Sequence, residues 1–249
     1  MQYNIPKIVH YCWFGKKEKP KNIKKCIDTW KKVLSDYEFI EWNEQNFDIN
    51  YNNYVKEAYN LQKYAFVSDI ARIVALKKFG GIYLDTDVKV IKKFDDLLDQ
   101  TCILGFEEKE NIATSFIAVQ PNHILLDEFL DEYKDIRFVD SDGNMDLTPN
   151  VIRLGNILTK RGLKLNGCYQ KLDEGIVVYP KEYFSPYDYI NCINQSTKNT
   201  YCIHLFYVTW MPIKTKIKKF LKKIIVTIIG KEKLEKLRIY INEKNNFFN

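Results

Sequence analysis

Hydrophobic and polar positions along the chain divide it into alternating strands and helices. Runs of apolar residues predict buried strands at residues 5–14, 37–42, 82–84, 102–106, 116–119, 176–179 and 201–205. Apolar residues that recur every three or four positions predict helices at residues 20–34, 54–61, 64–79, 125–133 and 151–160. Strands that alternate with helices in this way indicate a layered α/β domain.

The helix predicted at residues 64–79 has the strongest pattern, and a double glycine at residues 80–81 ends it. The short apolar strand 82–84 then runs into Asp85 and Asp87, with Thr86 between them. Because side chains alternate along a strand, two carboxylates two positions apart are expected on the same side. Binding sites in open α/β sheets lie at this end of a strand. The alternative is a polar turn, since Asp-x-Asp is common by chance.

Two carboxylates in this position would suit a divalent cation. Oxygen ligands are typical of Mg²⁺ and Mn²⁺ sites. Such an ion would bind a diphosphate and stabilise it as a leaving group. Residues 88–90 are expected to continue the extended chain beyond the pair.

Asp69 and Arg72 lie three residues apart on the strongest helix and so share a face of it. The residues around them are almost all apolar, which indicates that the pair is buried. A buried ion pair costs more to desolvate than an exposed one, so its place just before Asp85 favours a functional site. The alternative is an exposed local ion pair worth a few tenths of a kcal/mol.

Residues 64–72 and 80–87 together resemble glycosyltransferase family 32, the sugar transferases with a DXD motif. This family includes mannosyltransferases of the secretory pathway and bacterial capsule enzymes, and the chain is also similar to the catalytic domain of glucosylating bacterial toxins. The resemblance spans roughly residues 5–210, because residues 5–15 and 179–184, His204 and Trp210 also match.

The resemblance implies a GT-A fold, in which helices flank a central mixed sheet, and retaining transfer of a hexose from a nucleotide sugar. It implies that Asp87 binds Mn²⁺ or Mg²⁺ directly and that Asp85 contacts the ion or the ribose. Asp69 and Arg72 would hold the hydroxyls and phosphate of the donor. His204 would lie beside the ion or the diphosphate, as a third candidate metal ligand.

The same resemblance implies roles for three aromatic residues. Trp13 would stack near the nucleotide base, Tyr83 would line the nucleotide pocket, and Trp210 would close over the phosphate. The chain departs from the family pattern at Thr209, where the family often has Ser, and at Thr148-Pro149, where it has Thr-Gly-Pro. Polar contacts to sugar or acceptor are expected from a stretch that follows a strand and contains Asn111, Thr114 and Ser115.

No Asp or Glu can be assigned as a nucleophile, so we expect the acceptor to attack from the face that the diphosphate leaves. Relatives of the capsule group favour a UDP-sugar donor and a glycan or lipid-linked acceptor in surface polysaccharide synthesis. Three alternatives stay open: transfer to a protein, a metal-dependent phosphohydrolase, and a non-catalytic sugar- or nucleotide-binding module. A hydrolase needs a water-activating base, which the sequence does not identify.

Positive charge is concentrated at the carboxyl end of the chain. Residues 211–249 carry 11 Lys and Arg against 3 Asp and Glu, so the first 210 residues have a net charge of −2 within a total of +6. Residues 212–230 have an amphipathic pattern with a Lys-rich face, which is typical of helices at anionic membrane surfaces. We therefore predict a catalytic domain at 1–210 and a basic helical tail at 211–249. The tail could instead dock on the domain; nucleic-acid binding is disfavoured.

Nothing in the sequence indicates secretion or a membrane span. The first residues lack a basic start followed by a long apolar run, and no stretch reaches the roughly 18 apolar residues of a spanning helix. The six cysteines form no Cys-x-x-Cys pair and are expected to be buried free thiols. We expect a cytoplasmic protein whose tail associates with the inner face of the membrane.

Overall fold

The computed structural model describes residues 3–207. The chain divides into two compact units, Met1–Pro186 with Ser196–Leu205, and Tyr187–Gln195 with Phe206–Asn249. In the second unit, the described part contains an antiparallel hairpin of β10 (Tyr187–Asp188) and β11 (Ile193–Asn194). Trp210 and the predicted tail at 211–249 lie outside the described residues.

A mixed sheet forms the centre of the first unit. Its strands follow the order β2-β1-β3-β7-β5-β9-β8, with β6 paired to β5. β1 is parallel to β2 and β3, β7 is antiparallel to β3 and β5, and β9 is parallel to β5. The bounds are β1 Ile8–Cys12, β2 Glu38–Trp42, β3 Gly81–Leu84, β5 Cys102–Glu108, β6 Asn111–Ile112, β7 Phe116–Val119, β8 Gln170–Lys171 and β9 Ile176–Tyr179.

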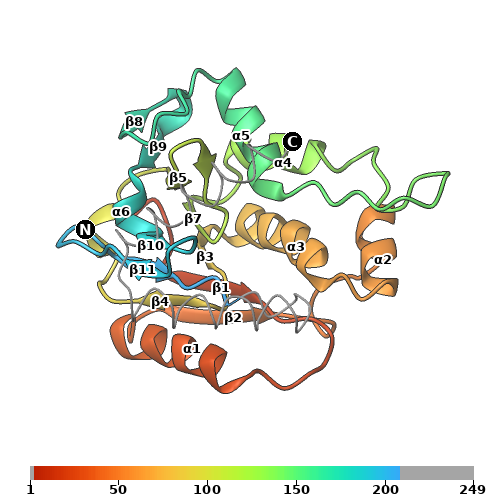
Figure 1. Cartoon of the computed structure of the whole chain (residues 1–249), viewed down its shortest axis with the longest axis horizontal. Coiled ribbons are helices and arrows are strands. Elements are labelled where there is room, and N and C mark those ends of the chain that lie inside the picture. Colours follow the sequence, from red (N-terminus) through yellow and green to blue (C-terminus); the bar gives the residue numbers. More distant parts are fainter. Residues whose placement is uncertain (1–2, 208–249) are drawn as a thin grey trace, which may run out of the picture. The chain divides into compact units, whose positions relative to one another are not determined.

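Helices cover both faces of this sheet (Figure 1). Alternation along β3 sends Ile82 and Leu84 into one hydrophobic core and Tyr83 into the other. The core that contains Tyr83 is closed by α2 (Asn53–Asn60), α3 (Tyr64–Phe79), α4 (Ile124–Asp131) and α5 (Asn150–Lys160). The opposite core is closed by α1 (Lys21–Val33), α6 (Lys181–Phe184) and the ladder of β4 (Val88–Val90) with β12 (Cys202–His204). The expected α/β fold with a central mixed sheet between helices is therefore confirmed.

The double glycine connects α3 directly to β3. Gly80 and Gly81 have φ angles of 62° and 101°, which glycine adopts without steric cost. A Cβ at Gly81 would lie 2.5 Å from the backbone oxygen of Ile8, and a Cβ at Gly80 would lie 2.6 Å from Pro121 Cδ. The chain can therefore reverse within two residues and place β3 against β1, with the carboxyl end of β3 close to α3.

Residues 88–90 are extended, as predicted, but they do not continue β3 within the central sheet. The chain turns after β3, and β4 (Val88–Val90) leaves the central sheet to pair antiparallel with β12 (Cys202–His204). Trp30 of α1 donates from Nε1 to the Val88 oxygen over 2.7 Å, which anchors β4 on the opposite face. The register pairs His204 with Val88, so this ladder carries His204 to the turn after β3.

Most of the remaining predicted elements are present with shifted ends. The first strand is shorter than residues 5–14, and β5 runs two residues beyond 106. The short elements β6, β8 and α6 and the 3₁₀ turns η1 (Asp95–Leu97) and η2 (Asp173–Gly175) were not predicted. Four cysteines are buried as expected, but Cys168 is exposed and Cys192 is half-buried. Within residues 3–207, no helix is both long and apolar enough to cross a membrane.

Candidate active site

The turn between β3 and β4 carries Asp85 and Asp87. The Asp85 backbone N–H donates to the Ser115 oxygen over 2.9 Å, and the Val88 N–H donates to the Asp85 oxygen over 2.9 Å. The two carboxylates follow the strand and lie together as predicted, but strand alternation is not the reason, because β3 ends at Leu84. A tight turn, held at the carboxyl end of β3 by the oxygen of Ser115 just before β7, sets their positions instead.

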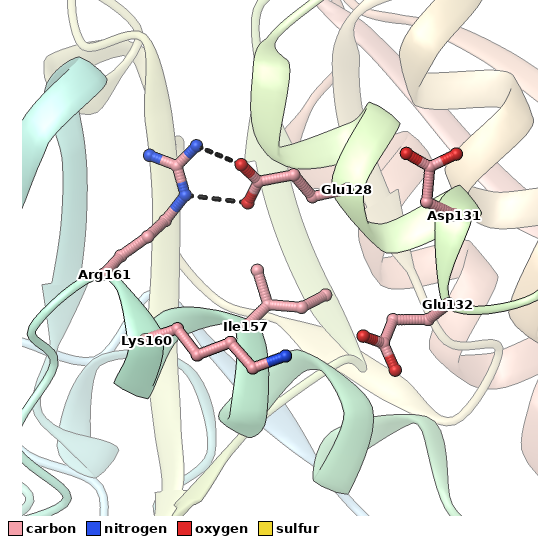
Figure 2. Close-up of a pocket in the computed structure, with 6 residues that line it drawn as sticks. All are labelled: Glu128, Asp131, Glu132, Ile157, Lys160 and Arg161. Atoms are coloured by element: carbon pink, nitrogen blue, oxygen red, sulfur yellow. Dashed lines mark hydrogen bonds and ion pairs between the residues drawn. The ribbon is translucent and has the colours of Figure 1, made fainter.

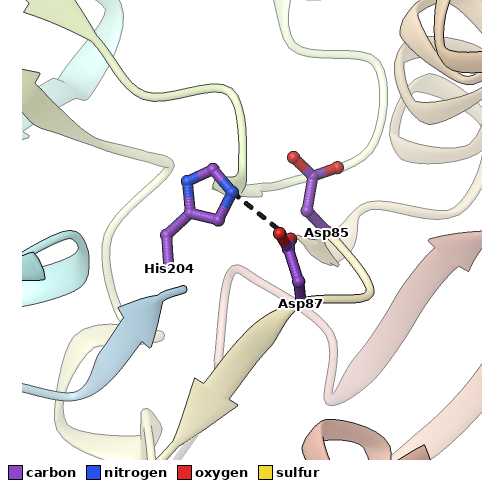
Figure 3. Close-up of side chains that lie close together, drawn as sticks. All are labelled: Asp85, Asp87 and His204. Atoms are coloured by element: carbon purple, nitrogen blue, oxygen red, sulfur yellow. Dashed lines mark ion pairs between the residues drawn. The ribbon is translucent and has the colours of Figure 1, made fainter. Parts of the chain in front are cut away.

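Asp85, Asp87 and His204 converge at this turn, as Figure 3 shows. Each offers one ligand atom, and these atoms all lie within 4.8 Å of one another. His204 Nε2 lies 3.3 Å from Asp87 Oδ1, and their side chains are only 12% and 15% exposed. The three candidate metal ligands, which are up to 119 positions apart in sequence, thus lie in one partly buried cluster.

Glu107 adds a third acidic group that the sequence did not indicate. His204 Nδ1 donates to Glu107 Oε1 over 3.2 Å, and Glu107 belongs to the part of β5 beyond its predicted end. Burial lowers the pKa of His204, but the charges of Asp87 and Glu107 outweigh it and raise that pKa to about 10. Without an ion, His204 is therefore protonated at neutral pH, and a cation at Nε2 would displace that proton.

Arg72 lies beside this cluster, and each of its three guanidinium nitrogens donates a hydrogen bond. Its Nη2 donates to Asp69 Oδ1 over 2.8 Å, its Nη1 donates to the Thr114 oxygen over 2.8 Å, and its Nε donates to the Ser68 oxygen over 3.2 Å. Its side chain is 6% exposed. The pair predicted from helical spacing is thus buried, and the alternative of an exposed local ion pair is excluded by this geometry.

Asp69 receives a second hydrogen bond from a residue that the sequence did not single out. Asn150, the first residue of α5, donates from Nδ2 to Asp69 Oδ1 over 2.6 Å and accepts at Oδ1 from Thr114 Oγ1 over 2.8 Å. Burial raises the pKa of Asp69 to about 6, Arg72 opposes this shift, and Asp85 adds to it. Asn150 follows Thr148-Pro149, where the chain departs from the family pattern.

Tyr83 connects the candidate metal cluster with the buried Asp69–Arg72 pair. Its hydroxyl donates to Asp85 Oδ1 over 3.0 Å, and the Arg72 guanidinium lies 4.5 Å from the centre of its ring. Arg72 Nη1 also lies 3.4 Å from Asp85 Oδ1. Asp85 is therefore held by Tyr83 and Arg72 together, so the metal cluster and the buried ion pair form one network. The Tyr83 ring is 1% exposed, and its role in a nucleotide pocket stays a prediction.

Trp13, Ser115, Asn111 and Trp210 are the remaining predicted residues, and the last of them lies outside the described part of the chain. Trp13 directly follows β1, which neighbours β3, and is half-buried, with its Nε1 donating to the Lys17 oxygen over 2.6 Å. Ser115 has a buried hydroxyl that finds no hydrogen-bond partner within residues 3–207. Asn111 lies in β6, half-buried. Trp210 falls among the residues that the structure does not describe.

The charges of this network fit a divalent cation. Asp69, Asp85, Asp87 and Glu107 supply carboxylates, while the cationic groups joined to them are Arg72 and His204. A dication would offset the excess negative charge once His204 has lost its proton. Carboxylate oxygens with one imidazole nitrogen form a ligand set that Mn²⁺ accepts, whereas Mg²⁺ prefers oxygen alone.

A separate hollow of about 320 Å³ lies between α4 and α5 (Figure 2). Its lining residues are Glu128, Asp131, Glu132, Ile157, Lys160 and Arg161, none of which belongs to the network above. Arg161 forms a two-point ion pair with Glu128, with its Nε donating over 2.8 Å. Arg161 and Glu128 thus pair with each other across the hollow, and we assign it no role in the chemistry.

Comparison with known proteins finds similarity to glycosyltransferases. Residues 20–104 match the family described as the glycosyltransferase sugar-binding region containing DXD motif. The chain is 37% identical over 84 residues to glucan organizing enzyme 1 of Cryptococcus neoformans var. grubii, covering 30% of this chain and 23% of that protein. It is 32% identical over 136 residues to inositol phosphoceramide mannosyltransferase 3 of Schizosaccharomyces pombe, covering 49% and 35%.

Among solved structures, the galactosyltransferase LgtC in complex with donor and acceptor sugar analogues is similar over 90% of this chain and 96% of that chain, with 13% identity and a TM-score of 0.43. The matched stretches span about a quarter to a third of the two curated relatives. The family match includes α3, the double glycine and the Asp85–Asp87 turn. Residues 20–104 therefore match the glycosyltransferase sugar-binding region that contains the DXD motif, in line with the resemblance to family 32.

Proposed function

We propose that this chain is a metal-dependent glycosyltransferase that moves a hexose from a nucleotide sugar, most readily a UDP-sugar, to a glycan or lipid-linked acceptor in surface polysaccharide synthesis. The observation that carries the proposal is the convergence of Asp85, Asp87 and His204 beside a buried ion pair. The family match over residues 20–104 supports sugar transfer. One relative is named as a mannosyltransferase of inositol phosphoceramide, which supports a lipid-linked acceptor.

In this proposal, Asp87 and His204 hold the ion, and Asp85 divides its interactions between the ion and the donor. A bound dication supplies charge stabilisation for the departing diphosphate. Asp85 is held by Tyr83 and Arg72 before any donor arrives, so little reorganisation is needed when charge develops.

Arg72 and Asp69 orient the donor sugar. The guanidinium is fixed by three hydrogen bonds, and Asp69 Oδ1 already accepts from Arg72 and Asn150. In the part of the chain that the structure describes, no hydrogen bond to Asp69 Oδ2 is found, which leaves that oxygen for a sugar hydroxyl. Orientation by such fixed groups is a main source of catalysis when no covalent intermediate forms.

We further propose that the transfer retains the anomeric configuration. The acceptor hydroxyl attacks the anomeric carbon from the face that the diphosphate leaves, the bond to the diphosphate oxygen breaks, and the departing phosphate takes the hydroxyl proton. Proton NMR of the first product formed tests this. A coupling constant that corresponds to the inverted anomer would contradict it.

The activity is tested by incubating the full-length protein with Mn²⁺ and UDP-glucose, UDP-galactose, UDP-N-acetylglucosamine or GDP-mannose, and measuring release of the nucleoside diphosphate. We expect one donor to be cleaved slowly without acceptor. Asp87→Asn should lower that rate by roughly 100-fold or more, because it removes a charged ligand at the point where charge develops. Asp142→Asn, which changes an exposed carboxylate elsewhere, should match the unmodified protein.

Parallel incubations with other substrates separate the alternative functions. Phosphate release from simple phosphate esters, with every nucleotide sugar left intact, would support the phosphohydrolase instead. Incorporation of labelled sugar into protein, with none in glycan or lipid extracts, would support a protein acceptor. Binding of a nucleotide sugar without any turnover would support the non-catalytic module.

A further inference from the structure

Glu107 and Glu108 are the last two residues of β5, and they make different contacts. Glu107 Oε1 lies 3.2 Å from His204 Nδ1, with its side chain 17% exposed. Glu108 instead accepts from Lys181 Nζ of α6 over 2.5 Å. Two adjacent carboxylates of equal charge therefore have separate partners, and only Glu107 reaches the candidate metal cluster.

When a cation occupies the site, the contact with Glu107 determines which nitrogen of His204 keeps its proton. An ionised carboxylate can only accept hydrogen bonds, so His204 Nδ1 must be the donor. A neutral imidazole with its proton on Nδ1 presents its lone pair at Nε2. Nε2 is the nitrogen that lies 3.3 Å from Asp87 Oδ1, on the side of the Asp85–Asp87 turn.

We propose that Glu107 is a positioning residue that holds the His204 ring with Nε2 directed at a divalent cation bound by Asp85 and Asp87. This inference rests on the proposed function, because it presumes the metal site. Glu107 is not itself one of the converging ligands: it approaches His204 from the opposite nitrogen. Carboxylates in this relation to a ligating histidine fix its tautomer and orientation, and their loss typically weakens metal binding by about 10–100-fold.

The backbone around His204 is held without Glu107. β12 pairs with β4, and the Leu205 N–H donates to the Asp87 oxygen over 3.1 Å. Removing the Glu107 carboxylate should therefore free the imidazole to rotate without displacing the strand. This separates a positioning role from a merely structural one, since metal affinity should change while the circular dichroism spectrum of the folded protein in metal-free buffer stays that of the unmodified protein.

The test compares Mn²⁺ binding by the full-length protein and three variants, by electron paramagnetic resonance of free Mn²⁺ with and without UDP. Glu107→Ala removes the acceptor and should weaken binding about 10–100-fold. Glu107→Gln keeps an oxygen acceptor for Nδ1–H and should fall between Glu107→Ala and the unmodified protein. Glu108→Gln removes the same charge one residue away and should bind like the unmodified protein.

Turnover gives a second measurement. With the donor that is cleaved, the Mn²⁺ concentration for half-maximal activity should rise in Glu107→Ala by the same factor as the dissociation constant. At saturating Mn²⁺ the kcat should return towards that of the unmodified protein, because Glu107 does not contact the donor in this proposal. A kcat that stays low at saturating metal, with unchanged Mn²⁺ affinity, would overturn the positioning role.

The outcomes distinguish this proposal from the function on which it rests. If the unmodified protein binds Mn²⁺ and Glu107→Ala binds it equally well, the metal site stands and the role of Glu107 is wrong. Equal losses in Glu107→Gln, Glu107→Ala and Glu108→Gln would point to net charge and overturn the hydrogen-bond role. If the unmodified protein binds no Mn²⁺, the metal-dependent function itself fails, and the role of Glu107 fails with it.

Discussion

At the scale of single residues, His10 and His204 are the same residue type but differ in charge: at neutral pH His10 is neutral and His204 is protonated. Trp42 Nε1 donates to His10 Nδ1 over 3.1 Å, so His10 Nε2 carries the proton and donates to the Gly80 oxygen over 2.8 Å. Burial lowers the pKa of His10 to about 4, although the Gly80 contact opposes the shift. Carboxylate neighbours raise the pKa of His204 to about 10. Partners rather than residue type thus decide the role of each histidine.

His10 predicts how stability depends on pH. Its pKa in the folded chain is lower than the usual 6.5, so the unfolded chain takes up a proton first as the pH falls. The stabilisation is complete above about pH 6.5 and is lost towards pH 4, by up to about 3 kcal/mol at 1.36 kcal/mol per unit. Urea unfolding between pH 7.5 and 4.5 measures the decline.

The variant His10→Gln provides the control for this prediction. Glutamine can offer the same donor and acceptor but does not titrate, so its stability should fall less over this pH range. A decline as steep as that of the unmodified protein would assign the effect to other groups. His204 acts in the opposite direction: its raised pKa gives stability below about pH 6.5 that is lost as the pH rises towards 10.

Glu107 and Asn150 show which site residues the sequence could not reveal. Their hydrogen-bond partners His204 and Asp69 are 97 and 81 positions away in the chain. Helical spacing relates Asp69 to Arg72 because three residues make nearly one turn. No comparable local period relates β5 to β12, or α3 to the start of α5, so these contacts follow from the packing of the sheet and its helices.

At the scale of elements, the connection from α3 to β3 matters most for the site. It places the helix with Asp69 and Arg72 next to the strand that leads to Asp85. Both glycines have positive φ, and the missing side chain of Gly81 leaves room for the β1 backbone at Ile8. The sequence predicted the end of this helix because a double glycine after a strong helical pattern is a specific signal of helix termination.

Gly81→Ala should destabilise the fold strongly. The new Cβ would meet the Ile8 oxygen at 2.5 Å, and alanine at a φ of 101° is strained, so we expect a loss of about 2 kcal/mol or more. Gly155→Ala is the matched control, since a Cβ there meets nothing within 4 Å in α5. It should gain roughly 0.5–1 kcal/mol from helix propensity. Equal midpoints for both variants in urea unfolding would contradict this prediction.

Element boundaries were predicted best where the hydrophobic pattern was long or had a clear end in the sequence. The helix at Tyr64–Phe79 and the strand at Phe116–Val119 match their predicted bounds. The two-residue strands β6 and β8 are too short to show a period. The sequence predicted that Asp85 and Asp87 lie together but not the turn that brings them together, because the departure of β4 from the sheet depends on its pairing with β12.

At the scale of the whole molecule, the charge distribution separates the predicted tail from the catalytic region. Residues 211–249 hold 11 of the 38 Lys and Arg residues but only 3 of the 32 Asp and Glu residues. This segment lies outside the described residues, so its membrane association remains a prediction from the sequence. A peripheral position would bring the active site near a lipid-linked acceptor.

The full-length protein should sediment with vesicles that contain anionic phosphatidylglycerol but not with neutral phosphatidylcholine vesicles. Each Lys near an anionic surface contributes about 1 kcal/mol, and salt screens this attraction. Replacing Lys218, Lys219, Lys222 and Lys223 by Gln should therefore release most of the bound protein at modest salt. Binding that persists in this variant, or to neutral vesicles, would contradict electrostatic binding to the membrane and favour apolar insertion alone.

The sequence by itself determined the α/β class, the strongest helix, its glycine stop and the residue types of the site. It could do so because these features depend on local periodicity and on backbone preferences of single residues. Only the tertiary structure decided that a turn presents Asp85 and Asp87, that β12 delivers His204, and that Glu107 and Asn150 complete the network. Those contacts join strands and helices that are distant in the chain, and burial sets their charge states, so no local pattern encodes them.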